Sequence, residues 1–147
     1  MDEATESRSD TFEIGDDLSV RRLGFGAMRL TSPDIIGRPD DEDAAREVLR
    51  RAVELGVDFI DTADSYGPGV SERLIGEALD PDAAVVATKA GLLRNRSGDW
   101  IPHGDPDYIR NQVLCSIDRL GVESISTSST GRIPILPSRT RSTPSPN

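Results

Sequence analysis

The chain has 147 residues, enough for one ordinary domain, and its 26 acidic and 17 basic residues give a formal net charge of −9. An acidic chain is a poor partner for nucleic acid or for an anionic membrane surface. No apolar stretch approaches the roughly 20 residues that span a bilayer, and the acidic N-terminus is unlike a secretory signal. The single cysteine, Cys115, excludes an intramolecular disulfide and suits a reducing compartment. We therefore predict a soluble cytoplasmic protein.

The acidic residues stop before the C-terminal part of the chain. Every Asp and Glu lies at or before Glu123, whereas residues 126–147 contain ten Ser or Thr, four Pro and three Arg. A segment of this composition cannot bury much apolar surface, so we expect it to be disordered. We divide the chain into a polar N-terminus with the start of a hairpin (1–17), a structured part (18–125) and a Ser/Thr/Pro-rich tail (126–147).

Apolar residues recur with the spacing of alternating strands and helices. Acidic residues 40–43 suit the start of a helix, Ser71 and Asp105 are candidate N-caps, and Gly56 and Gly121 are natural helix ends. The alternation predicts an α/β fold of parallel strands with right-handed crossovers. In chain order, we expect a hairpin (12–14 and 18–20), a strand (23–30), a helix (44–55), a strand (57–61), a helix (72–79), a strand (83–89), a helix (106–120) and a strand that begins at 122–125.

Residues able to transfer a proton follow two of the predicted strands. Lys89, the only lysine of the chain, ends one strand and Asp61 ends the strand before it. Barrel and doubly wound α/β folds place their sites at these strand ends. Tyr66 lies five residues after Asp61 in a glycine-rich loop. A phenol is a poor acid at neutral pH unless its anion is stabilised, which a nearby ammonium oriented by a carboxylate can do. Tyr66 could then protonate a carbonyl oxygen as hydride reaches the carbon.

The residues alone leave simpler interpretations open. Tyr66 can be a loop aromatic, Asp61 the cap of a turn and Lys89 a surface residue. His103, the only histidine, is expected to face solvent in a loop, and Trp100 can either border a substrate pocket or anchor that loop.

Several segments together resemble the aldo-keto reductases over roughly residues 18–125. The most specific is Asp61-Thr62-Ala63-Asp64-Ser65-Tyr66-Gly67, and the others agree with it in order and spacing. These others are 23–30, 56–60, 71–76, 86–89 and 116–122.

The resemblance implies an eight-stranded (β/α) barrel closed below by the N-terminal hairpin. This chain would hold the hairpin, about three βα units and a broken fourth strand. It also implies reduction of an aldehyde or ketone by NADP(H), or alternatively NAD(H), without a metal. The family's catalytic residues carry over to Asp61, Tyr66 and Lys89. Its cofactor-binding residues carry over to Gly26, Ala27 and Met28, together with Asp61.

The resemblance fails after Ile125. The family has a catalytic histidine at the end of strand four, in a pattern like Asp-Leu-Tyr-Gln-Leu-His, whereas this chain continues with Ser126-Thr127-Ser128-Ser129. The codons TCG-ACC-TCN-TCC-ACC-GGN are allowed for residues 126–131, and from their third nucleotide they spell Asp-Leu-x-His-Arg. A frameshifted or truncated gene product is therefore one hypothesis. We expect such a chain alone to be poorly soluble or molten, because open parallel sheets leave strand edges unpaired.

Three functions remain as hypotheses at this point. The first is an incomplete NAD(P)H-dependent carbonyl reductase that is weakly active or inactive. The second is a binding or regulatory module on a partial reductase fold. The third is an aldolase that forms a Schiff base on Lys89, which the joint spacing of Asp61, Tyr66 and Lys89 disfavours.

Overall fold

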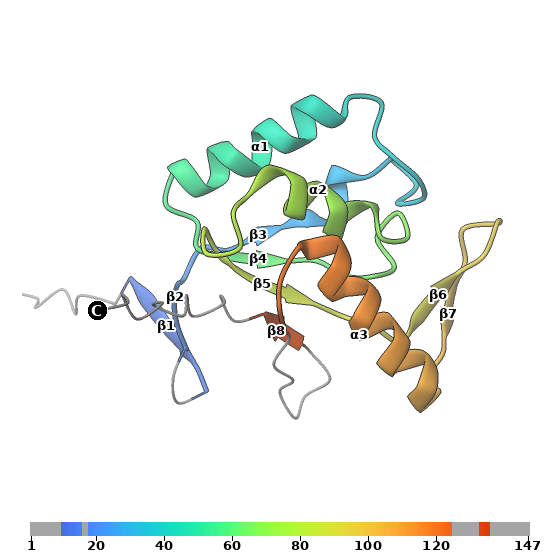
Figure 1. Cartoon of the computed structure of the whole chain (residues 1–147). Helices are drawn as coiled ribbons and strands as arrows, with labels where there is room; N and C mark the ends of the chain where they lie inside the picture. The colour runs from blue at the N-terminus through green and yellow to red at the C-terminus, as the bar shows by residue number, and fades with distance from the viewer. Residues whose placement is uncertain (1–9, 16–17, 125–132, 136–147) are drawn as a thin grey trace, which may run out of the picture.

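A computed structural model describes residues 10–15, 18–124 and 133–135 of the chain. Figure 1 shows two helices lying over one side of a small sheet, with a hairpin at each end of the molecule. None of the described helices is long and apolar enough to cross a membrane. The elements are β1 (Thr11–Ile14), β2 (Leu18–Arg21), β3 (Phe25–Gly26), the 3₁₀ helix η1 (Ala27–Leu30), α1 (Glu42–Glu54), β4 (Phe59–Asp61), α2 (Val70–Ala78), β5 (Val85–Thr88), β6 (Leu92–Arg94), β7 (Trp100–Pro102), α3 (Pro106–Leu120) and β8 (Ile133–Ile135).

The central sheet has the strand order β3-β4-β5-β8. β3 pairs with β4 and β4 with β5, both in parallel, as the alternation of elements predicted. Gly26 is the register partner of Asp61, which in turn pairs with Ala87. The C-terminal ends of the three parallel strands therefore meet along one edge of the sheet.

The fourth strand of the sheet differs from the expected one. Residues 122–124 are not in a strand, and the rest of the expected strand lies outside the described residues. The edge of β5 is taken instead by β8, which runs antiparallel and places Pro134 opposite Ala87. β8 ends the sheet, and an edge strand is where a proline, which lacks an N–H, is tolerated. The expected tail (126–147) is described only at β8.

The helix ends follow the predicted signals, with one correction. The Asp41 side chain accepts a hydrogen bond from the Ala44 amide at the start of α1, and Asp105 caps α3 in the same way. α3 ends at Gly121, whose φ of 66° is left-handed. Ser71, however, is not the cap of α2. It lies inside that helix, which begins after Gly69. Its buried hydroxyl accepts a hydrogen bond from Thr62 and donates one to the Ala27 carbonyl oxygen.

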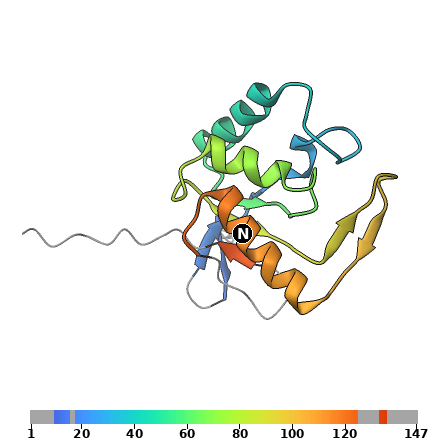
Figure 2. The ribbon, with the colours of Figure 1, turned by 45° about the vertical axis from the view of Figure 1, so that its right-hand side comes forward.

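Two stretches of chain form other elements than expected. The predicted strand 23–30 is only the two-residue β3, followed by η1, which buries Ala27 and Leu30. The loop after β5 contains the antiparallel hairpin of β6 and β7, which sequence patterns did not predict. Figure 2 shows this hairpin projecting from the rest of the molecule next to the start of α3.

The core lies between the parallel strands and the three α-helices. Leu49 of α1 and Ile60 of β4 are completely buried, and both helices α1 and α3 pack on α2. Acidic and basic residues cover the outer face of α1, where Arg46 bonds to Glu42, Asp43 and Glu77. The buried members of the core cluster are Ala27, Leu30, Ala45, Leu49, Ile60, Leu74, Ile75, Val86 and Leu120.

An apolar groove of about 710 Å³ lies between α1 and β3. Three of its lining side chains are large and exposed, with Leu23 at 78%, Leu55 at 66% and Val48 at 47% of their surface. Val48 is one of the apolar residues that recur at helical spacing in α1, and here it is uncovered. An open sheet that leaves an apolar face uncovered would have such a groove.

The crossing of α2 and α3 depends on Gly76. A Cβ at this position would overlap the Arg119 carbonyl oxygen of α3. We predict that Gly76→Ala lowers the free energy of unfolding by about 1–2 kcal/mol, although alanine is the better helix former. Gly104→Ala is the matched control, because its Cβ would meet no atom within 4 Å. Urea unfolding followed by circular dichroism would measure both variants, and equal midpoints would indicate that the chain lacks this close helix packing.

Candidate active site

The structure brings two of the three predicted catalytic residues into direct contact. The ammonium of Lys89, just after β5, donates hydrogen bonds to Asp61 Oδ1 and to the Thr62 carbonyl oxygen, the latter at 2.7 Å. The two charged side chains are about one-third exposed, 30% for Lys89 and 34% for Asp61. The pair is therefore held at the surface of the strand ends, where a ligand can reach it.

Tyr66 lies in the turn between β4 and α2, above the same ion pair. The ammonium of Lys89 is 5.4 Å from the centre of the Tyr66 ring. Gly67 exchanges backbone hydrogen bonds with Ile35 and Gly37 of the loop after η1. Gly67 has a φ of +83°, and a Cβ there would overlap Val70, so the turn that presents Tyr66 requires glycine. The three predicted residues thus form one cluster.

The β6–β7 hairpin, which the sequence did not predict, places Trp100 and Arg94 beside Tyr66. These two side chains are called the wall below. The rings of Tyr66 and Trp100 meet edge to face, with centroids 6.3 Å apart. Arg94 stacks on the other ring, with its guanidinium carbon 3.7 Å from the Trp100 centroid. Arg94 also donates to the carbonyl oxygens of Asp34, Ile35 and Gly98. Trp100 was expected either to border a substrate pocket or to anchor a loop. In the structure it lies in strand β7 and its ring contacts Tyr66.

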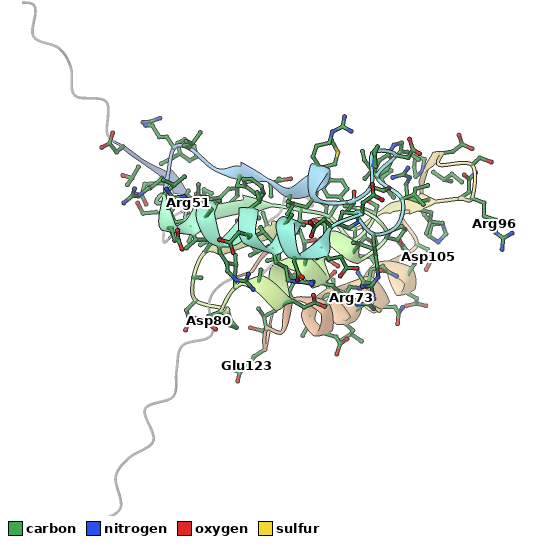
Figure 3. The ribbon with its side chains drawn as sticks, turned by 90° about the horizontal axis from the view of Figure 1, so that it is seen from above. Arg51, Arg73, Asp80, Arg96, Asp105 and Glu123 are labelled. Carbon is green, nitrogen blue, oxygen red and sulfur yellow. The ribbon has the colours of Figure 1, made fainter. Side chains whose placement is uncertain are left out.

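The position of the β6–β7 hairpin that carries the two side chains of the wall is visible from above the molecule. In Figure 3, Arg96 at the hairpin tip and Asp105 before α3 lie at one end, whereas Arg51 and Asp80 lie at the other. Asp80 precedes β5 in the chain and Arg96 follows it. The wall therefore stands at the C-terminal ends of the parallel strands, on the same side as Asp61 and Lys89.

Buried polar side chains fix the helices behind the cluster. Thr62, next to Asp61, donates to Ser71 Oγ at 2.8 Å, and Ser71 donates to the Ala27 carbonyl oxygen. Glu72 is completely buried. It accepts a hydrogen bond from Thr88 at 2.6 Å and forms an ion pair with Arg119 of α3. These contacts join α2 to the ends of β4 and β5, next to Asp61 and Lys89, and to α3.

A second acidic residue is buried within the motif itself. Asp64, two residues before Tyr66, is only 4% exposed, and its Oδ2 accepts a long hydrogen bond from Tyr108 at 3.4 Å. Burial, and next the charge of Glu72, raise the pKa of Asp64 to about 6. Burial, and next the charge of Asp64, raise the pKa of Tyr108 to about 12. The sequence pattern includes Asp64 within the motif but predicts no role for it.

The residues predicted to bind a cofactor lie beside Asp61. Gly26 is exposed at the end of β3, and a Cβ added there would meet no atom within 4 Å. Met28 is half-buried, whereas Ala27 is completely buried. His103 is half-buried rather than facing solvent, because its ring packs on Tyr108 with centroids 4.7 Å apart.

Comparison with known proteins identifies the class of protein. A model of the Aldo/keto reductase family matches residues 22–128. The chain is 48% identical over 120 residues to an uncharacterised oxidoreductase of Schizosaccharomyces pombe, covering 81% of this chain and 39% of the relative. It is 42% identical over 117 residues to pyridoxine 4-dehydrogenase of Escherichia coli, covering 78% and 41%.

Solved structures agree with the sequence relatives. An aldo-keto reductase of Bacillus halodurans in its holo form matches with a TM-score of 0.64 and 34% identity, over 78% of this chain and 37% of that one. A glycerol dehydrogenase of Gluconobacter oxydans matches with a TM-score of 0.64 and 32% identity, over 78% and 36%. The chain therefore belongs to the aldo/keto reductase family. It spans about two fifths of the length of these relatives, so its fold is the N-terminal part of a (β/α)₈ barrel.

The Glu72–Arg119 pair gives a prediction about stability. Arg119→Met would leave the buried Glu72 carboxylate without its counter-ion, and we expect it to lower the free energy of unfolding by about 3 kcal/mol or more. The matched control on the same helix is Arg110→Met, which breaks the exposed pair with Asp107 and should change little. Urea unfolding would compare them, and a similar effect of both variants would contradict a buried, paired Glu72.

The raised pKa of Asp64 gives a prediction about pH. The folded chain keeps this proton up to about pH 6, whereas an aspartate ordinarily releases it at 3.8. The folded state binds more protons in this window, so its free energy of unfolding should fall as pH rises from about 4 to 6. Two pKa units correspond to roughly 2–3 kcal/mol. Urea unfolding at several pH values should show this fall in the wild type and in Asp118→Asn, a control on the exposed face of α3, but not in Asp64→Asn.

Proposed function

We propose that the chain carries the proton-transfer part of an aldo-keto reductase site, with Tyr66 as general acid for reduction of an aldehyde or ketone. The observation that carries the proposal is the cluster itself, in which Lys89 bonds Asp61 and its ammonium lies 5.4 Å from the Tyr66 ring centre. The membership of the family supports the same chemistry. The partner molecule would be a small carbonyl compound, and we place the protein in the cytoplasm.

In the proposed reaction, each member of the cluster has a separate task. Tyr66 donates its hydroxyl proton to the carbonyl oxygen while hydride reaches the carbonyl carbon, which yields an alcohol. The phenolate left on Tyr66 is stabilised by the nearby ammonium of Lys89 and regains a proton from solvent. Asp61 and the Thr62 carbonyl oxygen hold that ammonium in place. The wall of Trp100 and Arg94 shields one side of Tyr66 from water.

Open space beside Asp61 supports a nicotinamide cofactor at the end of β3. Gly26 leaves open space next to its register partner Asp61, and Met28, two residues further along the chain, is half-buried. We propose that Gly26, Met28, the Ala27 backbone and Asp61 contact NADP(H), or alternatively NAD(H). The cofactor would supply the hydride, whereas the chain's residues supply position and charge.

A binding or regulatory role on a partial reductase fold is the second candidate. It is favoured by the apolar groove beside β3, where exposed Leu23, Val48 and Leu55 offer a surface for another polypeptide. The two candidates differ in whether Tyr66 supports turnover once the barrel is completed, as in the chimera described below. If the site of this chain is incomplete, the chain alone should oxidise NADPH with a test aldehyde at a negligible rate. Clear oxidation that Tyr66→Phe abolishes would contradict incompleteness and would support the catalytic assignment directly.

A chimera tests the catalytic assignment when the chain alone is inactive. Residues 18–124 of this chain would replace the matching part of the E. coli relative, whose own C-terminal part completes the barrel. We predict that the chimera oxidises or reduces its cofactor with substrate, and that Tyr66→Phe lowers the rate about 10²–10⁴-fold. Asp118→Asn, on the outer side of α3, is the control that should keep the rate. A folded chimera whose rate is the same with and without Tyr66→Phe would refute the role of Tyr66.

A further inference from the structure

Asp64 is an ionisable residue that the proposed reaction does not use. Its carboxyl is 4% exposed, and Oδ1 has no hydrogen-bond partner. The partner of Oδ2 is the Tyr108 hydroxyl at 3.4 Å, a long bond. A buried carboxylate with one unbonded oxygen costs folding free energy, so its place in this turn needs a reason.

The backbone of Asp64 holds the turn that presents Tyr66. Its amide donates to the Lys89 carbonyl oxygen at 3.0 Å, and its own carbonyl oxygen accepts from Gly69 at 2.7 Å. The first bond ties the turn to the end of β5, and the second closes the turn on the start of α2. A displacement of Asp64 would therefore move Tyr66, two residues further along, relative to Lys89.

Charged and titratable groups face Asp64 from α2, from α3 and from the end of β5. From α2 the Glu72 carboxylate repels it, while from α3 the Arg119 guanidinium attracts it and Tyr108 donates to it. Arg119 is itself paired with Glu72, and Lys89 at the end of β5 is paired with Asp61. His103, before α3, packs against the Tyr108 ring. The charged groups of Lys89 and Arg119 are thus paired with other carboxylates, and Tyr108 is the side chain that donates a hydrogen bond to the Asp64 carboxyl.

We propose that Asp64 is a positioning residue, which fixes Tyr66 by joining its turn to Tyr108 of α3 and shifts Tyr66 against Trp100 when it gains or loses a proton. Burial and repulsion from Glu72 destabilise the ionised carboxylate of Asp64. Ionisation therefore pushes the Asp64 side chain away from α2, and the turn moves with it. Burial and the charge of Glu72 also raise the pKa of Asp64 to about 6. The carboxyl therefore gains or loses its proton near pH 6, and the turn is expected to move there. The inference rests on the proposed role of Tyr66, but its test requires no turnover.

Trp100 is the probe for this movement. It is the only tryptophan of the chain, and its ring meets the edge of Tyr66. The fluorescence of the full chain would be recorded between pH 4.5 and 8.5. We expect one transition near pH 6 that disappears in Asp64→Asn. The hydrogen bond from Tyr108 stabilises the ionised carboxylate of Asp64. Because Tyr108→Phe removes this bond, the midpoint should move to higher pH.

The alternative source of a transition in this range is His103, since histidine commonly changes charge between pH 5 and 8. His103→Gln should therefore keep the transition. Loss of the transition in His103→Gln, its persistence in Asp64→Asn, or a flat wild-type profile would each overturn the proposal. If circular dichroism shows that Asp64→Asn is unfolded, an unchanged midpoint in Tyr108→Phe would overturn it instead. Failure of the proposed function would appear separately, as a chimera insensitive to Tyr66→Phe.

Discussion

The buried carboxylate of Glu72 joins the parts of the structure that hold the candidate site. One oxygen accepts from Thr88 at the end of β5, and the other pairs with Arg119 of α3. Because Glu72 lies on α2, this single side chain fixes a strand and two helices at once. A buried charge is tolerated only where such partners are supplied. The place of α3, and with it Tyr108 beside Asp64, follows from this contact.

The parts of the fold that sequence predicted are those with local causes. Helix α3 has a capping aspartate, a proline in its first turn and a glycine at its end, so its bounds were correct to the residue. The parallel order of β3, β4 and β5 followed from the alternation of strands and helices. Asp61 and Lys89 were expected at neighbouring strand ends, and they form an ion pair there.

The parts that sequence missed depend on distant contacts. Ser71 is a residue type that often caps helices, but its hydroxyl bonds to Thr62 and to the Ala27 carbonyl oxygen, and Gly69 is the N-cap of α2 instead. The hairpin of β6 and β7 is short, and Arg94 fastens it to carbonyl oxygens about 60 residues earlier in the chain. No local pattern reports such a contact, so the wall beside Tyr66 was not predicted.

The geometry of the site also depends on which parts of the barrel are present. The Asp61–Lys89 pair lies at the ends of β4 and β5, which are flanked on both sides by other strands. β3, by contrast, ends the sheet among the described residues and borders the apolar groove. A proton-transfer cluster on inner strands can therefore keep its geometry while the open edge remains uncovered. Gly26, where a cofactor contact is expected, belongs to that edge strand, so binding of the cofactor should depend more strongly on completion of the barrel than the geometry of the cluster does.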